Sequence, residues 1–222
     1  MVKVRVWDLP TRLFHWLLVA AVVGLVVTGN VGGNWINWHM RLGYLVFSLV
    51  LFRLVWGVLG GQWSRFSAFV PSPRRLWAYL RGTGDGHSVG HNPLGALSVL
   101  ALLAVLSAQV ASGLMTDDEI AFTGPLVGLV SSETVSLASW YHSEVGKLVL
   151  LALIALHVSA IVFYGVVKKQ KLVRAMVTGD QEAPAPLPVE SHDNLATRLL
   201  ALGVWCCCAG VVYAVVSVGS PG

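Results

Sequence analysis

The sequence predicts an all-α integral membrane fold, a four-helix bundle followed by a fifth, C-terminal transmembrane helix. Of the 222 residues, 55% are hydrophobic and only 12% are charged, and the mean hydropathy of +0.71 is too high for a typical soluble domain. The apolar residues gather in five runs of about 20, the helix length that crosses a bilayer core about 30 Å thick. Lys and Arg lie between these runs and form no single basic surface, which argues against nucleic acid as a partner.

The expected spans cover residues 13–31, 39–60, 94–115, 142–166 and 195–217. The first follows Lys3, Arg5 and Arg12, as a secretory signal would. Its apolar stretch is long, however, and no A-x-A-like cleavage site follows Thr28, so we expect it to stay as an anchor. The third span contains no ionisable residue and carries a stripe of alanines, which predicts a role in helix packing.

The connections between the spans indicate the orientation. The N-terminus, residues 61–93 and the segment after the fourth span are rich in Lys and Arg, which accumulate on the cytoplasmic side of membranes. The opposite connections are an uncharged loop at 30–38 and an acidic loop at 116–141. We therefore expect a cytoplasmic N-terminus and a C-terminus on the outer side.

Two segments outside the spans have a distinct composition. Residues 73–81 begin with proline and mix aromatic residues with arginines, as a short helix on the membrane surface would. Residues 179–194 begin Pro-rich and acidic, and we interpret them as a cytoplasmic linker between a membrane domain at 1–178 and the fifth span at 195–217. The consecutive Cys206–Cys208 in that span predict neither a disulfide framework nor a zinc site, and their role stays open.

Four of the seven histidines fall inside or at the edge of the spans, where imidazoles are costly and usually functional: His15, His39, His142 and His157. The topology places His15 and His157 toward the cytoplasmic side, and His39 and His142 at the outer side. From His142 to His157 the fourth helix rises about 22 Å and turns by about 60°, so both side chains can face one bundle interior. The sequence thus predicts two histidine pairs at different depths.

Such pairs suit haem iron better than zinc. A structural zinc ion needs four protein ligands, whereas haem iron needs only two axial ones. Because the sequence contains no Cys-x-x-Cys-His motif, the haem would be b-type, without thioether links. A proton relay through single histidines is the alternative, but it would need carboxylates at membrane depth, where Glu144 is the nearby candidate.

A glycine follows each outer histidine by four residues. Gly43 lies one helical turn beyond His39, and Gly146 one turn beyond His142, where the missing Cβ would leave room for a flat macrocycle. An ordinary glycine at a helix–helix contact is the competing explanation for each.

Arginines are the candidate partners of haem propionates. Arg41 at the outer level and Arg53 near the inner end of the second span are suitably placed, although side chains that reach out to the headgroups would look the same. His87, His91 and His192 lie in connecting segments, and we interpret them as solvated or capping residues outside the haem sites.

Several motifs between about residues 5 and 180 also resemble those of a known family: Arg12-Leu13-Phe14-His15-Trp16, Trp38-His39 to Gly43, Gly90-His91-Asn92-Pro93-Leu94-Gly95, Gly124-Pro125-Leu126, and His142 with His157. Together they resemble the bacterial cytochrome b561 family, which includes the membrane cytochrome b subunits of nickel–iron hydrogenases. The resemblance implies a four-helix core that binds two b haems through these four histidines. The fifth span is not part of the pattern.

Two haems at opposite depths would form a path for electrons across the membrane. Together with the resemblance, this implies an electron-transfer subunit in the bacterial inner membrane. An independent enzyme is less favoured. Its partners would be a quinone, ubiquinone or menaquinone, and a periplasmic c-type cytochrome or hydrogenase. The acidic loop would suit a basic docking partner.

Two other functions compete with this one. A self-contained superoxide/quinone oxidoreductase would be favoured by a cationic outer pocket, whereas the outer loops are acidic apart from Arg41. A transporter or scaffold is disfavoured, because the spans lack charged pairs and broken-helix patterns.

Overall fold

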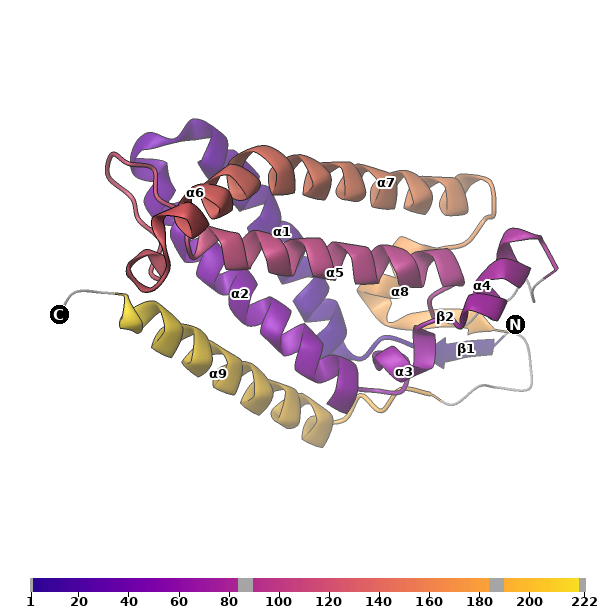
Figure 1. The fold of residues 1–222 in the computed structure, drawn as a ribbon. Helices are drawn as coiled ribbons and strands as arrows, with labels where there is room; N and C mark the ends of the chain where they lie inside the picture. The colour runs from indigo at the N-terminus through magenta and orange to yellow at the C-terminus, as the bar shows by residue number, and fades with distance from the viewer. Residues whose placement is uncertain (1, 84–89, 184–189, 220–222) are drawn as a thin grey trace. The chain divides into compact units, whose positions relative to one another are not determined.

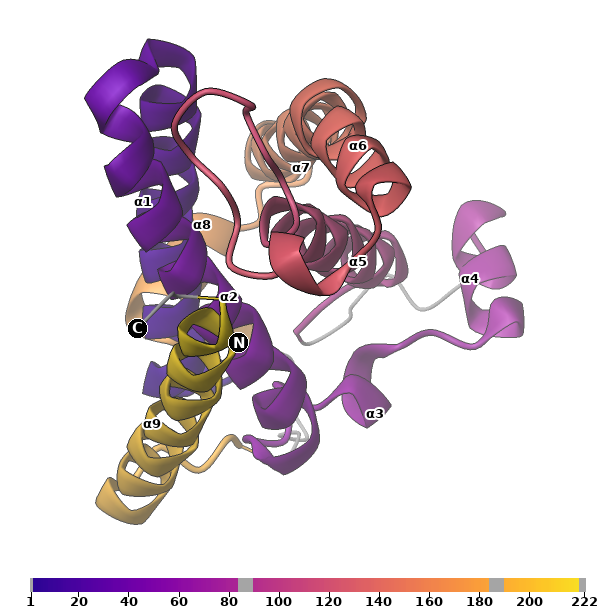
Figure 2. The ribbon, with the colours of Figure 1, turned by 60° about the vertical axis from the view of Figure 1, so that its left-hand side comes forward.

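The computed structural model describes residues 2–83, 90–183 and 190–219, and within these ranges it confirms the predicted all-α membrane fold (Figure 1). Five helical segments among them are long and apolar enough to cross a membrane. They are α1 (Leu9–Val31), α2 (Ile36–Leu59), α5 (Pro93–Gly113), the combined segment Ser132–Val166, and α9 (Leu195–Val218). Figure 2 shows the same helices from a second direction.

The fourth segment starts earlier than the sequence predicted and is not uniform. It consists of α6 (Ser132–Trp140), a π-helical segment (Tyr141–Gly146) and α7 (Lys147–Val166). Ser131 caps α6 by accepting a hydrogen bond from the Thr134 amide at 3.4 Å. The connection after α5 therefore ends in a helix and is shorter than the expected loop at 116–141.

The connections contain short elements: η1 (Gly33–Trp35), α3 (Phe66–Phe69), α4 (Pro73–Leu80), η2 (Val127–Leu129) and α8 (Leu172–Thr178). The helix expected at 73–81 is present as α4. Its first residue is Pro73, and the Ser72 hydroxyl accepts a hydrogen bond from the Arg75 amide. A proline at the first position and a serine N-cap both favour the start of a helix.

A two-stranded antiparallel sheet joins distant parts of the chain. Strand β1 (Val2–Arg5) pairs with β2 (Asp180–Ala183), with Val2 opposite Ala183 and Arg5 opposite Asp180. Gly179, whose φ of +90° favours glycine, makes the turn before β2, and its carbonyl accepts from the amides of Val6 and Trp7. The expected linker at 179–194 thus begins with a strand, and its residues 184–189 lie outside the described residues.

The chain divides into two compact units. The first combines Met1–Phe14, Arg53–Leu102 and Leu153–Leu202, and the second combines His15–Phe52, Leu103–Ala152 and Gly203–Gly222. In the second unit Ala21 of α1, Val46 and Val50 of α2, and Leu106 of α5 form an apolar core. In the first unit a smaller cluster of Val6, Trp7 and Ala175 packs the N-terminal segment against α8.

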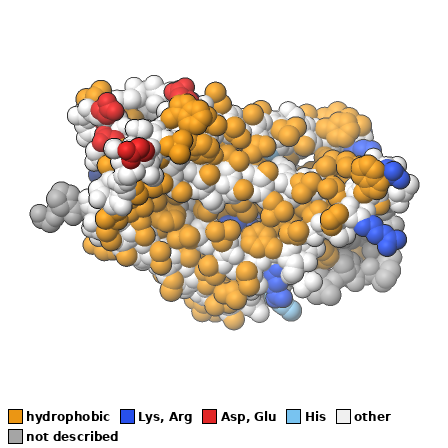
Figure 3. All heavy atoms as spheres, viewed as in Figure 1, with side chains coloured by type: hydrophobic (Ala, Val, Ile, Leu, Met, Phe, Trp, Pro, Cys, Tyr) orange, Lys and Arg blue, Asp and Glu red, His pale blue; other side chains and the backbone are white. Residues whose placement is uncertain are grey.

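Large apolar side chains also cover the outside of the long helices. Val58 is 67% exposed, Leu156 65% and Val162 57%. Hydrophobic side chains occupy most of the face drawn in Figure 3. Surfaces of this kind on helices of membrane length are explained by contact with lipid, so the chain is a multi-pass membrane protein.

Candidate functional site

The structure brings together two of the four predicted histidines. His39 of α2 and His142 of the π-helical segment face each other with ring centroids 6.1 Å apart and ring planes at 86°. Two metal–nitrogen bonds of about 2.0 Å, with about 1.1 Å from each nitrogen to its ring centre, give about 6 Å. The separation therefore suits a single metal ion bound by both imidazoles.

Each of these rings is oriented by a carbonyl on a neighbouring helix. His39 Nδ1 lies 3.0 Å from the Leu25 carbonyl oxygen of α1, and His142 Nδ1 lies 2.9 Å from the Gln109 carbonyl oxygen of α5. A carbonyl can only accept, so both Nδ1 atoms carry the proton and both Nε2 atoms keep a lone pair. Histidines that bind metals usually donate their second ring nitrogen in this way.

Zinc chemistry does not suit this pair. Among the residues that the structure describes, no group of three or more His, Cys, Asp or Glu side chains is placed to hold a metal ion. A site with two imidazoles fits haem iron, which brings its own equatorial nitrogens. The geometry at His39 and His142 therefore fits an axially ligated haem.

The third long helix, expected only to pack, also contacts the site. The Gln109 amide Nε2 donates to the His142 carbonyl oxygen at 2.8 Å, within the π-helical segment. Such segments are often found at functional sites because they change the direction of a side chain. Nothing in the sequence marks Gln109 as a site residue, since α5 contains no ionisable residue.

The two candidate glycines differ in their surroundings. Nothing lies within 4 Å of the position that a Cβ at Gly43 would take, so this glycine faces open space. A Cβ at Gly146 would overlap Gln109 Oε1 and approach the Tyr141 ring to 2.7 Å. The glycine at position 146 is thus explained by close helix packing, which was the alternative to room for a macrocycle.

The two candidate arginines are both held by aromatic rings. The Arg41 guanidinium lies 5.2 Å from the centre of the Trp38 ring. Arg53 is only 3% exposed, donates to the Ser64 carbonyl oxygen at 3.0 Å and lies 4.9 Å from the Phe66 ring. Arg53 therefore does not reach out to headgroups.

His157 and His15 each lie beside a polar or aromatic neighbour. His157 of α7 is partly buried, and its Nδ1 lies 3.4 Å from the Ser98 hydroxyl of α5. His15 of α1 is partly buried too, with its ring 5.0 Å from that of Trp16. Their pairing stays a prediction.

His91 is not the solvated residue that the sequence suggested. Its ring lies 4.7 Å from Trp7 and 4.6 Å from Phe69, and its Nδ1 atom is buried without a hydrogen-bond partner. Burial, reinforced by the nearby Arg53 charge, lowers the pKa of His91 to about 3, so the imidazole is neutral at physiological pH.

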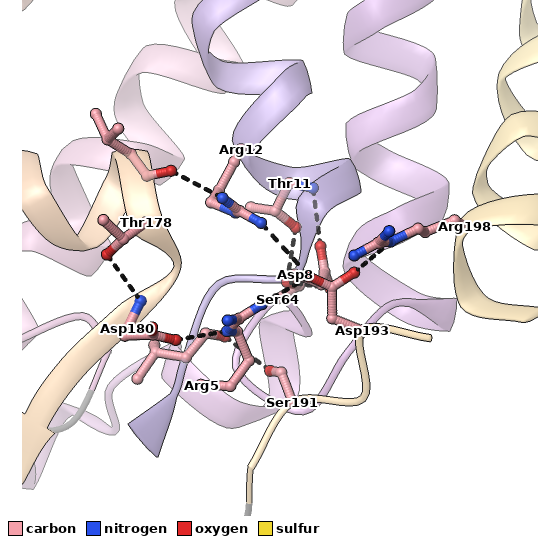
Figure 4. A network of polar contacts seen from close by, with 12 residues as sticks. Arg5, Asp8, Thr11, Arg12, Ser64, Thr178, Asp180, Ser191, Asp193 and Arg198 are labelled. Carbon is pink, nitrogen blue, oxygen red and sulfur yellow. Dashed lines mark hydrogen bonds and ion pairs between the residues drawn. The ribbon is translucent and has the colours of Figure 1, made fainter. Parts of the chain in front are cut away.

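Asp8, which the sequence does not single out, is fully buried below the start of α1 (Figure 4). Its carboxylate accepts hydrogen bonds from the Thr11 amide at 2.8 Å, the Ser64 hydroxyl at 3.0 Å, the Gly61 amide at 3.2 Å and the Trp56 indole at 3.4 Å. The bond to Thr11 is an N-cap, which explains why α1 begins at Leu9, ahead of the expected residue 13.

Asp193 binds three arginines in the same region (Figure 4). Its oxygens lie 3.0 Å from Arg5, 3.4 Å from Arg12 and 2.9 Å from Arg198. The Ser191 hydroxyl adds a hydrogen bond to the Val6 carbonyl oxygen at 2.7 Å. The segment that leads into α9 is therefore attached to the N-terminal residues.

The acidic loop between α5 and α6 has a defined internal structure. The Asp118 carboxylate accepts hydrogen bonds from the amides of Ile120, Ala121 and Phe122 at 2.8–3.0 Å. These bonds, with that from Phe122 the largest contribution, hold the pKa of Asp118 below its ordinary value. Ile120 at the tip of the loop is 91% exposed.

Comparisons with known proteins agree on one family. A family model described as prokaryotic cytochrome b561 matches residues 6–179. A protein of Azotobacter vinelandii, named as a probable Ni/Fe-hydrogenase B-type cytochrome subunit, is 26% identical, with 79% of this chain and 87% of that protein covered. A protein of the same name from Cupriavidus necator is 24% identical over 78% of this chain and 85% of its own length. No solved structure matches the chain.

Proposed function

Since this chain belongs to the prokaryotic cytochrome b561 family, we propose that it carries electrons through two bis-histidine b haems between the quinone pool and a periplasmic redox partner. Family membership makes it a b-type cytochrome of membrane electron transfer. The observation that supports the proposal most is the facing pair of His39 and His142, 6.1 Å apart. His15 and His157 would bind the second haem, nearer the cytoplasmic side.

The protein's contribution at the outer site follows from its geometry. Bound haem supplies a one-electron iron couple, whose potential depends on its ligands and surroundings. His39 and His142 would bind through Nε2, because each Nδ1 is engaged with a carbonyl oxygen. Both imidazoles are partly buried.

The direct test is a reduced-minus-oxidised spectrum with quantitation of extracted haem from the purified chain. We expect two b haems per chain, and replacement of His39 or His142 with alanine should remove one of them. His157→Ala should remove the other. His192→Ala, on an exposed side chain, is the matched control and should keep both. A chain without haem would reject the proposed function, and loss of the same haem in His39→Ala and His157→Ala would reject the pairing.

The redox partner is proposed from the relatives and from the outer loop. Relatives named as hydrogenase cytochrome subunits suggest a hydrogenase, and a c-type cytochrome is the other candidate. A basic surface on either partner would be attracted to the carboxylates of Asp117, Asp118 and Glu119, which lie beside the exposed Ile120. This supports docking at the loop.

Neutralising substitutions can test that docking. Asp117→Asn combined with Glu119→Gln should slow electron transfer at low salt and reduce its salt dependence, because fewer charges then guide the encounter. Glu133→Gln on α6 is the control, since it removes one exposed charge outside the loop tip. An unchanged salt dependence in the double variant would rule out this docking surface.

The membrane and orientation are part of the same proposal. The basic segments on one side and the acidic loop on the other support an inner-membrane protein with a cytoplasmic N-terminus and a periplasmic C-terminus. A reporter that is active only in the periplasm should be active when fused after Val218. An inactive C-terminal fusion together with an active one in the 61–93 connection would reverse the orientation.

A further inference from the structure

The rings of His39 and His142 are held by two copies of the same three-part arrangement, which we call the cradles. Each cradle consists of a backbone carbonyl, a hydroxyl residue three positions later and the glycine that follows it. The α1 cradle is Leu25, Thr28 and Gly29, and the α5 cradle is Gln109, Ser112 and Gly113.

The hydroxyls in both cradles can only accept from the histidines. Thr28 Oγ1 donates its proton to the Gly24 carbonyl at 2.7 Å, and its oxygen lies 3.4 Å from His39 Nδ1. Ser112 Oγ donates to the Ala108 carbonyl at 2.8 Å, and its oxygen lies 3.5 Å from His142 Nδ1. Because its proton is already used, each hydroxyl presents a lone pair to Nδ1. Carbonyl and hydroxyl therefore both require a protonated Nδ1.

The glycines set how closely each ring approaches its helix. A Cβ at Gly113 would lie 2.8 Å from His142 Cε1, closer than real Cβ atoms come. A Cβ at Gly29 would lie 3.1 Å from both Cε1 and Nδ1 of His39. Any side chain at Gly113 must displace the ring, and one at Gly29 must press on it.

We propose that the two cradles are positioning devices that fix one tautomer of both axial ligands and hold their ring planes crossed. The inference rests on the proposed haem site. With both Nδ1 atoms donating, both Nε2 atoms keep the lone pair with which they would bind the same iron. Because the cradles lie on different helices, each ring is held by its own helix, and the ring planes lie at 86° to each other.

The cradles also act on the electron affinity of the bound iron. A hydrogen bond from Nδ1 to an oxygen makes the imidazole a stronger electron donor, which favours the ferric state and lowers the reduction potential. Two hydroxyls beside two carbonyls strengthen this effect on both sides. Removing a hydroxyl should therefore raise the potential of the outer haem.

The test uses the full chain in detergent and compares glycine variants. Ferric haems with crossed imidazole planes give a highly anisotropic low-spin EPR signal, whereas parallel planes give a rhombic one. The wild type should show the anisotropic signal for the haem that His39→Ala removes. Gly113→Ala should shift this signal, and Gly29→Ala should shift it less. Gly210→Ala on α9, where nothing lies within 4 Å of a Cβ, is the matched control and should not change it.

Variants of the two hydroxyl residues test the effect on the potential. Ser112→Ala and Thr28→Val, which remove a hydroxyl, should raise the potential of the outer haem. The conservative Ser112→Thr and Thr28→Ser, which keep the hydroxyl, should leave it at the wild-type value. If Gly113→Ala fails to fold, the variants of Ser112 and Thr28 and Gly29→Ala still test whether the cradles act on the ligands.

Each outcome separates the inference from the function on which it rests. If the wild type binds two haems but every cradle variant keeps the wild-type EPR signal and reduction potential, the cradles do not position the ligands. The proposed function would then still hold. A wild type that binds no haem would overturn both. A rhombic wild-type signal for the outer haem would refute the crossed planes alone.

Discussion

Replacing Asp8 with alanine should destabilise the chain more than any exposed acidic substitution. The change removes the N-cap of α1, which contributes about 1 kcal/mol. It also leaves the buried Ser64 hydroxyl and Gly61 amide without their acceptor, at a cost of about 1–3 kcal/mol each. Because such effects are not fully additive, we expect a loss of about 3–5 kcal/mol in the free energy of unfolding.

The matched control is Asp180→Ala, the same change at a carboxylate that is 34% exposed and pairs with Arg5. An exposed pair of this kind contributes about 0–1 kcal/mol. Unfolding in mixed micelles of increasing SDS content, followed by tryptophan fluorescence, would compare both variants with the wild type. Asp8→Asn should lie between them, because it keeps one acceptor oxygen. Equal shifts for Asp8→Ala and Asp180→Ala would refute the argument.

Two further predictions concern pH, and one concerns Arg12. The pKa of His91 is lowered to about 3 in the folded chain, so His91 contributes to stability above its ordinary pKa of about 6.5, and this contribution is lost as the pH falls. His91→Phe, which keeps the contacts with Trp7 and Phe69, should reduce the loss of stability between pH 7 and pH 5; an unchanged pH profile would contradict it. Burial raises the pKa of Asp193, but the bonds from Arg198 and the Leu9 amide outweigh it and lower the pKa. The attachment of the 190–194 segment, followed by hydrogen exchange, should therefore persist at pH 5 and weaken only below about pH 4, and weakening already at pH 6 would refute this. Arg12→Ala should increase hydrogen exchange in residues 190–194 at neutral pH, because it removes one of the arginines that bind Asp193. It also removes the hydrogen bond of 2.8 Å from Arg12 to the Val177 carbonyl oxygen.

The sequence was sufficient to predict the long helices, and it singled out His39 and His142, whose rings lie 6.1 Å apart. Apolar runs of membrane length and imidazoles within them are local features, and helical rise converts their positions into depth. Ser72 and Pro73 similarly predict the start of α4, because capping depends on neighbouring residues.

The cradles could not be predicted in the same way. Their acceptors are the carbonyls of Leu25 and Gln109, and every residue has a carbonyl, so nothing in the sequence marks these two. The repeated Thr28-Gly29 and Ser112-Gly113 pairs were the one available indication. The π-helical segment around His142 was equally inaccessible, because its geometry depends on packing against α5.

The pairing of β1 with β2 has a consequence for the order of biosynthesis. Arg5 and Asp180 are separated by 175 residues, so strand β1 leaves the ribosome long before its partner. At about 5–20 residues per second, β1 waits roughly 10–35 s with an unpaired edge. The attachment of Asp193 to Arg5 and Arg12 comes later still. The first unit is therefore completed only late in synthesis, and nascent chains that stop before residue 180 should remain open to protease at their N-termini.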